Sequence, residues 1–85
     1  MLALGFTDDG WDDYQHWVST DRATLTRVNA LIRDARRNPR SGIGKPEQLK
    51  YLDGSAWSRR ITQEHRLVYS CDDLRLTVWQ CRYHY

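Results

Sequence analysis

The C-terminal third of the chain, residues 57–85, reads WSRRITQEHRLVYSCDDLRLTVWQCRYHY. It is rich in β-branched and aromatic residues, and short polar stretches divide it into three runs. Runs of this composition are typical of β-strands. We therefore predict three consecutive strands, at Trp57–Thr62, His65–Cys71 and Arg75–Tyr83.

Side chains alternate between the two faces of a strand, so residue parity predicts the face that each side chain occupies. Arg59 and His65 break the resulting pattern, and we expect them where the strands run out into the connecting loop. The cationic face could bind a polyanion, or it could be an ordinary solvated surface. The predicted apolar floor contains Trp57, Ile61, Leu67, Tyr69, Cys71, Trp79, Cys81 and Tyr83. The predicted polar face contains Ser58, Arg60, Thr62, Arg66, Gln80, Arg82 and His84.

Length and charge limit the kinds of protein that this chain can be. The 85 residues suit a single domain, residues 1–85, with one small core to which four Trp and five Tyr supply large apolar side chains. The formal net charge is only +2, but residues 33–66 hold nine Lys or Arg against four Asp or Glu. This local excess of positive charge indicates an anionic partner, although a solvated basic surface without a partner has the same composition.

Other features limit the choice of class. No apolar run approaches the ~20 residues of a membrane span, and residues 1–13 lack the basic and apolar regions of a signal peptide. Cys71 and Cys81 have no metal-ligand spacing and fall on the predicted apolar floor. We expect two buried free thiols in a reducing cytoplasm, and no metal or other cofactor.

The N-terminal half reads as a strand, Leu2–Phe6, followed by two helices. Thr7 is a suitable N-cap for the first helix, and the segment 19–21 separates it from the second. The second helix should end near Asn38, because Pro39 disfavours helix in the residue before it. Apolar residues at helical spacing form one face of each helix. They are Trp11, Tyr14, Trp17 and Val18 in the first helix, and Leu25, Val28, Leu31, Ile32 and Ala35 in the second.

The middle of the chain connects the helices to the strands. Arg40–Pro46, RSGIGKP, is a glycine-containing loop without the GxxxxGK[ST] pattern of a nucleotide-binding loop. A short strand is expected at Glu47–Leu52, followed by a turn at Asp53-Gly54. The predicted order is β-α-α-β-β-β-β, which indicates an α+β fold with a mainly antiparallel sheet and two helices packed on one face.

Three side chains could together cleave RNA without a metal. Glu47 follows the basic loop, where neighbouring cations would keep its carboxylate ionised and available as a base. Arg66 would stabilise the phosphate. His84 lies on the polar face and is the best acid of the three histidines, since His16 is expected to be structural or solvated and His65 follows a turn. Base, cation and acid are what attack by a 2′-hydroxyl requires, but the sequence alone does not bring these residues together.

Several segments closely resemble the YoeB (Txe) family of bacterial toxins, within the RelE-like superfamily of type II toxin–antitoxin systems. The most specific are WSRRITQEHRLVY, residues 57–69, and CRYHY, residues 81–85. Residues 11–14 (WDDY), 32–37 (IRDARR) and 42–47 (GIGKPE) agree as well. The resemblance covers nearly the whole chain, in order and spacing.

The resemblance implies a microbial-ribonuclease-like fold and an mRNA endonuclease that needs no metal and cuts the codon in the A site of the 70S ribosome. It also implies neutralisation by a cognate YefM-type antitoxin, and it leaves open whether the free toxin forms a homodimer. Carried over residue by residue, the general base is Glu47, the phosphate-binding arginine is Arg66 and the general acid is His84. Supporting positions map onto Lys50, Arg60 and Tyr85.

Two other functions are consistent with parts of the sequence. A ParE-like inhibitor of DNA gyrase would share the fold without ribonuclease activity, but such proteins lack the set formed by Glu47, Arg66 and His84. A plain RNA-binding module would need exposed aromatic side chains to stack on bases, and parity assigns most aromatics to the floor. Gln63 departs from the family, whose members often carry a second acid at this position, and we expect it to affect the turn and not the chemistry.

Overall fold

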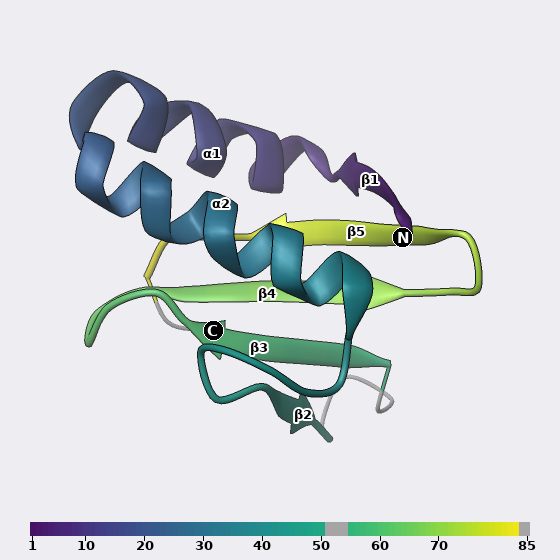
Figure 1. The fold of residues 1–85 in the computed structure, drawn as a ribbon. Coiled ribbons are helices and arrows are strands. Elements are labelled where there is room, and N and C mark those ends of the chain that lie inside the picture. The colour runs from purple at the N-terminus through teal and green to yellow at the C-terminus, as the bar shows by residue number, and fades with distance from the viewer. Residues whose placement is uncertain (51–54, 84–85) are drawn as a thin grey trace.

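The computed structural model describes residues 1–50 and 55–83. Within them the chain forms seven helices and strands, in the predicted order (Figure 1). They are β1 (Ala3–Phe6), α1 (Asp8–Thr20), α2 (Arg22–Arg37), β2 (Glu47–Leu49), β3 (Ala56–Arg60), β4 (Arg66–Cys71) and β5 (Arg75–Gln80). The predicted elements are confirmed, with strand ends that differ by one to three residues. Lys50 lies in a turn, and the expected Asp53-Gly54 turn lies outside the described residues.

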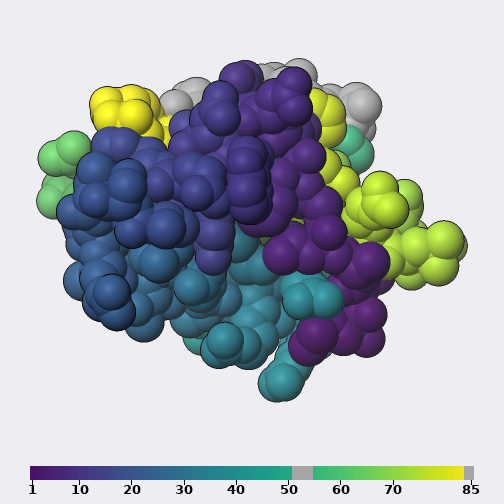
Figure 2. All heavy atoms as spheres, turned by 90° about the horizontal axis from the view of Figure 1, so that it is seen from above, coloured from purple at the N-terminus to yellow at the C-terminus, as the bar shows by residue number. Residues whose placement is uncertain are grey.

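The strands form one sheet in the order β1-β5-β4-β3-β2. β1 runs parallel to β5, and the other three pairings are antiparallel. Both helices lie on the same side of this sheet, which confirms the α+β fold with helices on one face (Figure 1). Seen from above, with α1 toward the viewer, the turn between β4 and β5 projects beyond the helices (Figure 2). No helix in the described part of the chain is long and apolar enough to cross a membrane.

Local chemistry explains where the helices begin and end. The hydroxyl of Thr7 accepts a hydrogen bond from the Gly10 N–H at 3.0 Å, and the carboxylate of Asp21 accepts one from the Thr24 N–H at 3.1 Å. These side chains satisfy N–H groups that have no partner inside a helix. The second helix ends at Asn38, directly before Pro39. All three boundaries confirm the sequence prediction.

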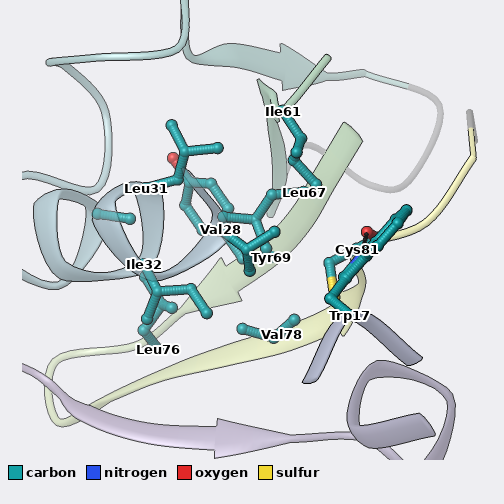
Figure 3. Packing of buried hydrophobic residues seen from close by; sticks show 11 residues of the cluster. Trp17, Val28, Leu31, Ile32, Ile61, Leu67, Tyr69, Leu76, Val78 and Cys81 are labelled. Carbon is teal, nitrogen blue, oxygen red and sulfur yellow. Dashed lines mark hydrogen bonds between the residues drawn. The ribbon is translucent and has the colours of Figure 1, made fainter. Parts of the chain in front are cut away.

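The core lies between the helices and the inner face of the sheet, the face that the helices cover (Figure 3). Most of the apolar stripe of α2 packs against strands β4 and β5, and all of its members are buried except the half-buried Leu25. Of the apolar face of α1, Trp17 is buried and Tyr14 is half-buried, whereas Trp11 and Val18 are about half exposed. The buried core residues are Trp17, Val28, Leu31, Ile32, Ala35, Ile61, Leu67, Tyr69, Leu76, Val78 and Cys81.

A shift in register between β4 and β5 corrects the predicted faces. Val68 pairs with Gln80 and Tyr69 pairs with Val78, so Trp79 is an extra residue opposite this junction. Such a bulge reverses the alternation of side chains. Leu76 and Val78 are therefore buried, whereas Trp79 is 50% exposed and does not belong to the floor. After the bulge the odd-numbered position faces the core again, so Cys81 is buried as predicted.

Three further expectations about burial need correction. Tyr83 is 57% exposed and lies outside the floor, and Cys71 is only half-buried. Cys81, by contrast, is a buried free thiol as expected, and burial raises the pKa of this thiol to about 12. The face of the sheet away from the helices, here called the outer face, is not uniformly polar. It carries a small buried apolar cluster of Leu49, Ala56 and Val68.

Arg59 is the largest departure from the pattern. It is fully buried on the inner face and paired with Leu67 inside the ladder of β3 and β4, one residue before β3 ends, and not in the connecting loop. Its Nη1 donates to Asp34 Oδ2 at 2.6 Å, and its Nε donates to the Tyr69 hydroxyl at 3.0 Å. A buried charge is tolerated only when it is paired and fully hydrogen-bonded. The remaining donors of the guanidinium meet the carbonyl oxygens of Asn38, Ser41 and Ile43 at 2.6–3.0 Å.

These contacts fold the loop between α2 and β2 around the Arg59 guanidinium. The loop needs glycine at two places, because Gly42 has φ +115° and Gly44 has φ +82°. A Cβ on Gly44 would lie 2.6 Å from Leu31 Cδ2, and one on Gly42 would overlap Asp34 Oδ2. The loop is therefore a packed structure that leads into the first residue of β2.

Replacing Asp34 with Asn should destabilise the fold, because it leaves the buried guanidinium without its anion. We expect the free energy of unfolding to fall by about 3 kcal/mol at pH 7, the lower end for a broken buried ion pair, since the Asp34 side chain is 27% exposed. Asp12→Asn, an exposed change on α1, is the matched control. Urea denaturation measures both, and equal stability of Asp34→Asn and the unchanged protein would contradict the role of this ion pair.

The effect of Asp34→Asn should also depend on pH. The hydrogen bond from Arg59 lowers the pKa of Asp34 below its ordinary value of 3.8. A lowered folded-state pKa stabilises the fold fully above the unfolded-state pKa, and this stabilisation is lost as the pH falls through the folded value. The difference between the unchanged protein and Asp34→Asn should therefore be constant above about pH 5 and shrink below pH 4. A difference that grew in acid would contradict this assignment.

Candidate active site

The outer face gathers three of the six residues proposed from the sequence. Glu47 pairs with Ser58 across β2 and β3, and Arg60 pairs with Arg66 across β3 and β4. Because Arg60 lies two residues beyond Ser58 on the same strand, it is the diagonal neighbour of Glu47, at ~7–8 Å in an antiparallel sheet. The register therefore brings a carboxylate and two guanidinium groups into two adjacent rows on one face.

Glu47 is the first residue of β2 and is exposed. Its position follows from the loop around Arg59, since the loop ends at Pro46 and the Arg60 N–H donates to the Gly44 carbonyl at 2.7 Å. Lys45, which lies between Gly44 and Pro46, has a left-handed backbone with φ +53°. The carboxylate is thus placed by a rigid turn and remains accessible to a ligand.

Arg66 is half-buried at the start of β4. Its Nη1 donates to the carbonyl oxygens of Thr62, Gln63 and His65 at 2.7, 3.2 and 3.1 Å. A guanidinium has three further N–H donors on Nε and Nη2, and none of the hydrogen bonds among the described residues uses them. The loop carbonyls therefore orient the group and leave its other edge to an anion.

Arg60 is exposed and lies directly opposite Arg66. Like charges at opposed positions of a sheet repel each other, so an anion that bridges the two guanidinium groups would relieve the repulsion. The main-chain carbonyl of Arg60 accepts from Arg27 Nη2 at 3.2 Å, which adds a third cation nearby. The predicted cationic face is confirmed at these positions.

Helix α1 holds the main chain that leads toward the C-terminus. The Cys81 N–H donates to Asp13 Oδ2 at 3.1 Å, and the Cys81 carbonyl accepts from Trp17 Nε1 at 2.8 Å. The indole of Trp17 lies beside Cys81 in Figure 3. Burial raises the pKa of Asp13, and the hydrogen bond from Cys81 opposes that shift. This end of the described chain is thus anchored by helix side chains and by the buried Cys81, whereas Trp79 and Tyr83 are half exposed.

The structure describes only one of the three other proposed residues. Lys50 is exposed in the turn after β2, and His84 and Tyr85 lie outside the described residues. Strand parity assigned Trp79 to the apolar floor and so did not offer it as a site residue. In the structure Trp79 is exposed on the outer face, and its Nε1 donates to Ser70 Oγ at 2.8 Å. Only the bulge puts Trp79 there, so strand parity could not have found it. Among the described residues, no three His, Cys, Asp or Glu side chains are grouped to hold a metal.

Comparison with solved structures defines the class of protein. A YoeB/ParE toxin from Agrobacterium tumefaciens matches with a TM-score of 0.92 at 50% identity, over 99% of this chain and 100% of that one. The YoeB dimer from Staphylococcus aureus matches with a TM-score of 0.92 at 39% identity, over 99% and 98% of the two chains. A heterotetrameric YoeB–YefM complex from the same organism gives 0.89 at 38% identity, over 100% and 99%. The class is that of bacterial toxins from toxin–antitoxin systems.

The amino-acid sequence narrows this class to one family. The family model for the YoeB-like toxin of bacterial type II toxin–antitoxin systems matches residues 6–85. Toxin YoeB of Escherichia coli K12 is 49% identical over 84 residues, which are 99% of this chain and 100% of that protein. The chain belongs to the YoeB-like toxin family, as its sequence motifs predicted.

The paired arginines predict a measurable affinity for inorganic phosphate. Phosphate should raise the melting temperature, because a ligand that binds only the folded state stabilises it, by about 1.4 kcal/mol at ten times its dissociation constant. Arg60→Gln and Arg66→Gln should each reduce this effect, whereas Arg22→Gln on α2 should not. Thermal melts with phosphate and with chloride at equal ionic strength measure it, and equal stabilisation of all variants would show that the phosphate effect is not local to this face.

Proposed function

We propose that this toxin is a ribosome-dependent mRNA endoribonuclease that cleaves mRNA in the ribosomal A site and thereby arrests translation. The observation that carries the proposal is the outer face, where Glu47, Arg60 and Arg66 occupy adjacent rows of the sheet. Membership of the YoeB-like family supports it. RNA binding requires positive charge near the reacting phosphate, and the two arginines provide it.

In the proposed reaction, Glu47 takes the proton from a ribose 2′-hydroxyl. The 2′-oxygen forms a bond to phosphorus, and the bond from phosphorus to the 5′-oxygen breaks. His84 gives a proton to the departing 5′-oxygen, so the products are a 2′,3′-cyclic phosphate and a 5′-hydroxyl. Arg66 stabilises the negative charge that develops on the phosphate, with Arg60, Lys50 and Tyr85 in support.

This chemistry needs no metal, because the substrate supplies its own nucleophile and guanidinium groups can neutralise the phosphate. The geometry of Arg66 suits the role, since three loop carbonyls hold Nη1 and fix the orientation of the group. A donor that is oriented before the reaction loses no free energy to reorganisation when charge develops.

The proposed partner is a YefM-type antitoxin, in line with the S. aureus YoeB–YefM complexes that this chain resembles. Residues 33–66 are rich in Lys and Arg, so an acidic segment that folds on binding would complement this surface and could cover the outer face. A toxin homodimer is a second assembly to consider, because the similar S. aureus YoeB forms a dimer.

The ends of the cleaved mRNA test the mechanism. On programmed ribosomes the toxin should cut within the A-site codon and leave 5′-hydroxyl ends, and cleavage should survive EDTA when enough magnesium remains to keep the ribosomes intact. End-labelling and primer extension measure both properties. 5′-Phosphate ends would contradict attack by the 2′-hydroxyl. Loss of DNA supercoiling without mRNA cleavage would instead indicate a ParE-like gyrase inhibitor.

Substitution of the proposed acid and base tests their roles. Glu47→Gln and His84→Gln should each lower the single-turnover cleavage rate by ~10²–10⁴-fold, because each removes a proton-transfer group. Removal of residues 84–85 should do the same while the protein stays folded. His16→Gln on α1 is the matched control and should cleave normally. Circular dichroism and antitoxin binding verify folding, and a folded His84→Gln that cleaves at a near-normal rate would show that His84 is not the acid.

A further inference from the structure

The main chain just before the proposed acid is fixed by hydrogen bonds on both sides of Arg82. On one side, Cys81 is held by Asp13 and Trp17 of α1. On the other side, the Tyr83 carbonyl accepts from the Arg66 N–H at 3.0 Å. This last bond joins the end of the described chain to the residue proposed to bind phosphate.

The Tyr83 N–H has an unusual partner. It donates to the ring nitrogen Nδ1 of His65 at 2.7 Å, where a regular sheet would offer a main-chain carbonyl. An imidazole nitrogen accepts a hydrogen bond only when it carries no proton. The contact therefore requires the neutral form of His65 with its proton on Nε2.

The backbone of Tyr83 shows why it needs this partner. Its φ is +62°, in the left-handed region that side chains other than glycine seldom adopt. Strained conformations of this kind persist only where the surroundings hold them. The hydrogen bonds to His65 and from Arg66 are the contacts that hold the Tyr83 main chain.

Packing in turn fixes the His65 ring. Its centroid lies 4.8 Å from Trp17 at an interplanar angle of 76°, and 5.5 Å from the Tyr83 ring at 48°. The indole of Trp17 thus orients His65 while its own Nε1 holds Cys81. One aromatic residue of α1 therefore supports both ends of the segment 81–83.

We propose that His65 is a positioning residue, whose Nδ1 latches Tyr83 in its left-handed conformation beside the main chain of Arg66, and that mRNA cleavage depends on this latch. The inference rests on the proposed function in so far as His84 acts as the acid. The latch itself is a property of the free toxin and can be observed without cleavage.

Two substitutions separate the latch from simple packing. His65→Phe keeps an aromatic ring against Trp17 but removes the acceptor. His65→Asn loses the ring, but its Oδ1 can occupy the place of Nδ1 and accept from the Tyr83 N–H. Packing alone predicts that Phe is the better replacement, whereas the latch predicts that Asn is.

The experiment measures two quantities for the full chain and both variants. Amide hydrogen exchange of Tyr83, followed by NMR, should be roughly tenfold faster in His65→Phe and nearly unchanged in His65→Asn, as expected for one lost hydrogen bond. Single-turnover cleavage on saturating ribosomes should fall ~10²-fold in His65→Phe, because misplacement of a catalytic group by about 1 Å has an effect of that size. The affinity for ribosomes should stay unchanged. His65→Asn should cleave within a few-fold of the normal rate.

Each outcome decides between the two accounts. If His65→Phe retains normal Tyr83 protection and cleavage, or if His65→Asn is the more impaired variant in both, the latch is overturned. If the unchanged toxin does not cleave mRNA at all, the proposed function fails and the catalytic consequence of the latch fails with it. The amide exchange of Tyr83 then still decides whether His65 holds the chain.

Discussion

The burial of one guanidinium group, that of Arg59, shapes much of this small protein. A charge with no access to water must satisfy its donors within the chain. Asp34 and Tyr69 supply two of its partners, and the carbonyls of the loop after α2 supply the rest. The loop must therefore pass close over the group, and the left-handed glycines Gly42 and Gly44 make that path possible.

The loop connects this buried ion pair to the outer face. Arg59 and Arg60 are neighbours, and the alternation of a strand points one into the core and the other toward solvent. The same loop leads into Glu47, the first residue of β2, which is the diagonal neighbour of Arg60 across β2 and β3. Arg59 is thus a structural residue that helps to fix where the candidate carboxylate and cations lie, although it is itself buried on the inner face.

The chain beyond β5 is held in a different way. One main-chain bond to a strand remains there, from the Arg66 N–H of β4 to the Tyr83 carbonyl. Other main-chain groups of Cys81 and Tyr83 bond to the side chains of Asp13, Trp17 and His65. Such contacts depend on side-chain chemistry, so a substitution can weaken them without disturbing the core. Residues 81–83 are therefore held by α1 and by the loop before β4.

The sequence by itself determined the order of elements, the helix boundaries, the buried stripe of α2 and the family, because capping, periodicity and motif spacing are local properties. It also placed Arg60 and Arg66 on one face correctly, since alternation holds through β3 and β4. Only the tertiary structure decided the rest. The bulge at Trp79 reverses the faces of β5, the pairing of Arg59 with Asp34 joins residues 25 positions apart, and the Tyr83 contact joins residues 18 apart. Such long-range contacts arise from the packing of α1, α2 and the sheet, which no local pattern records.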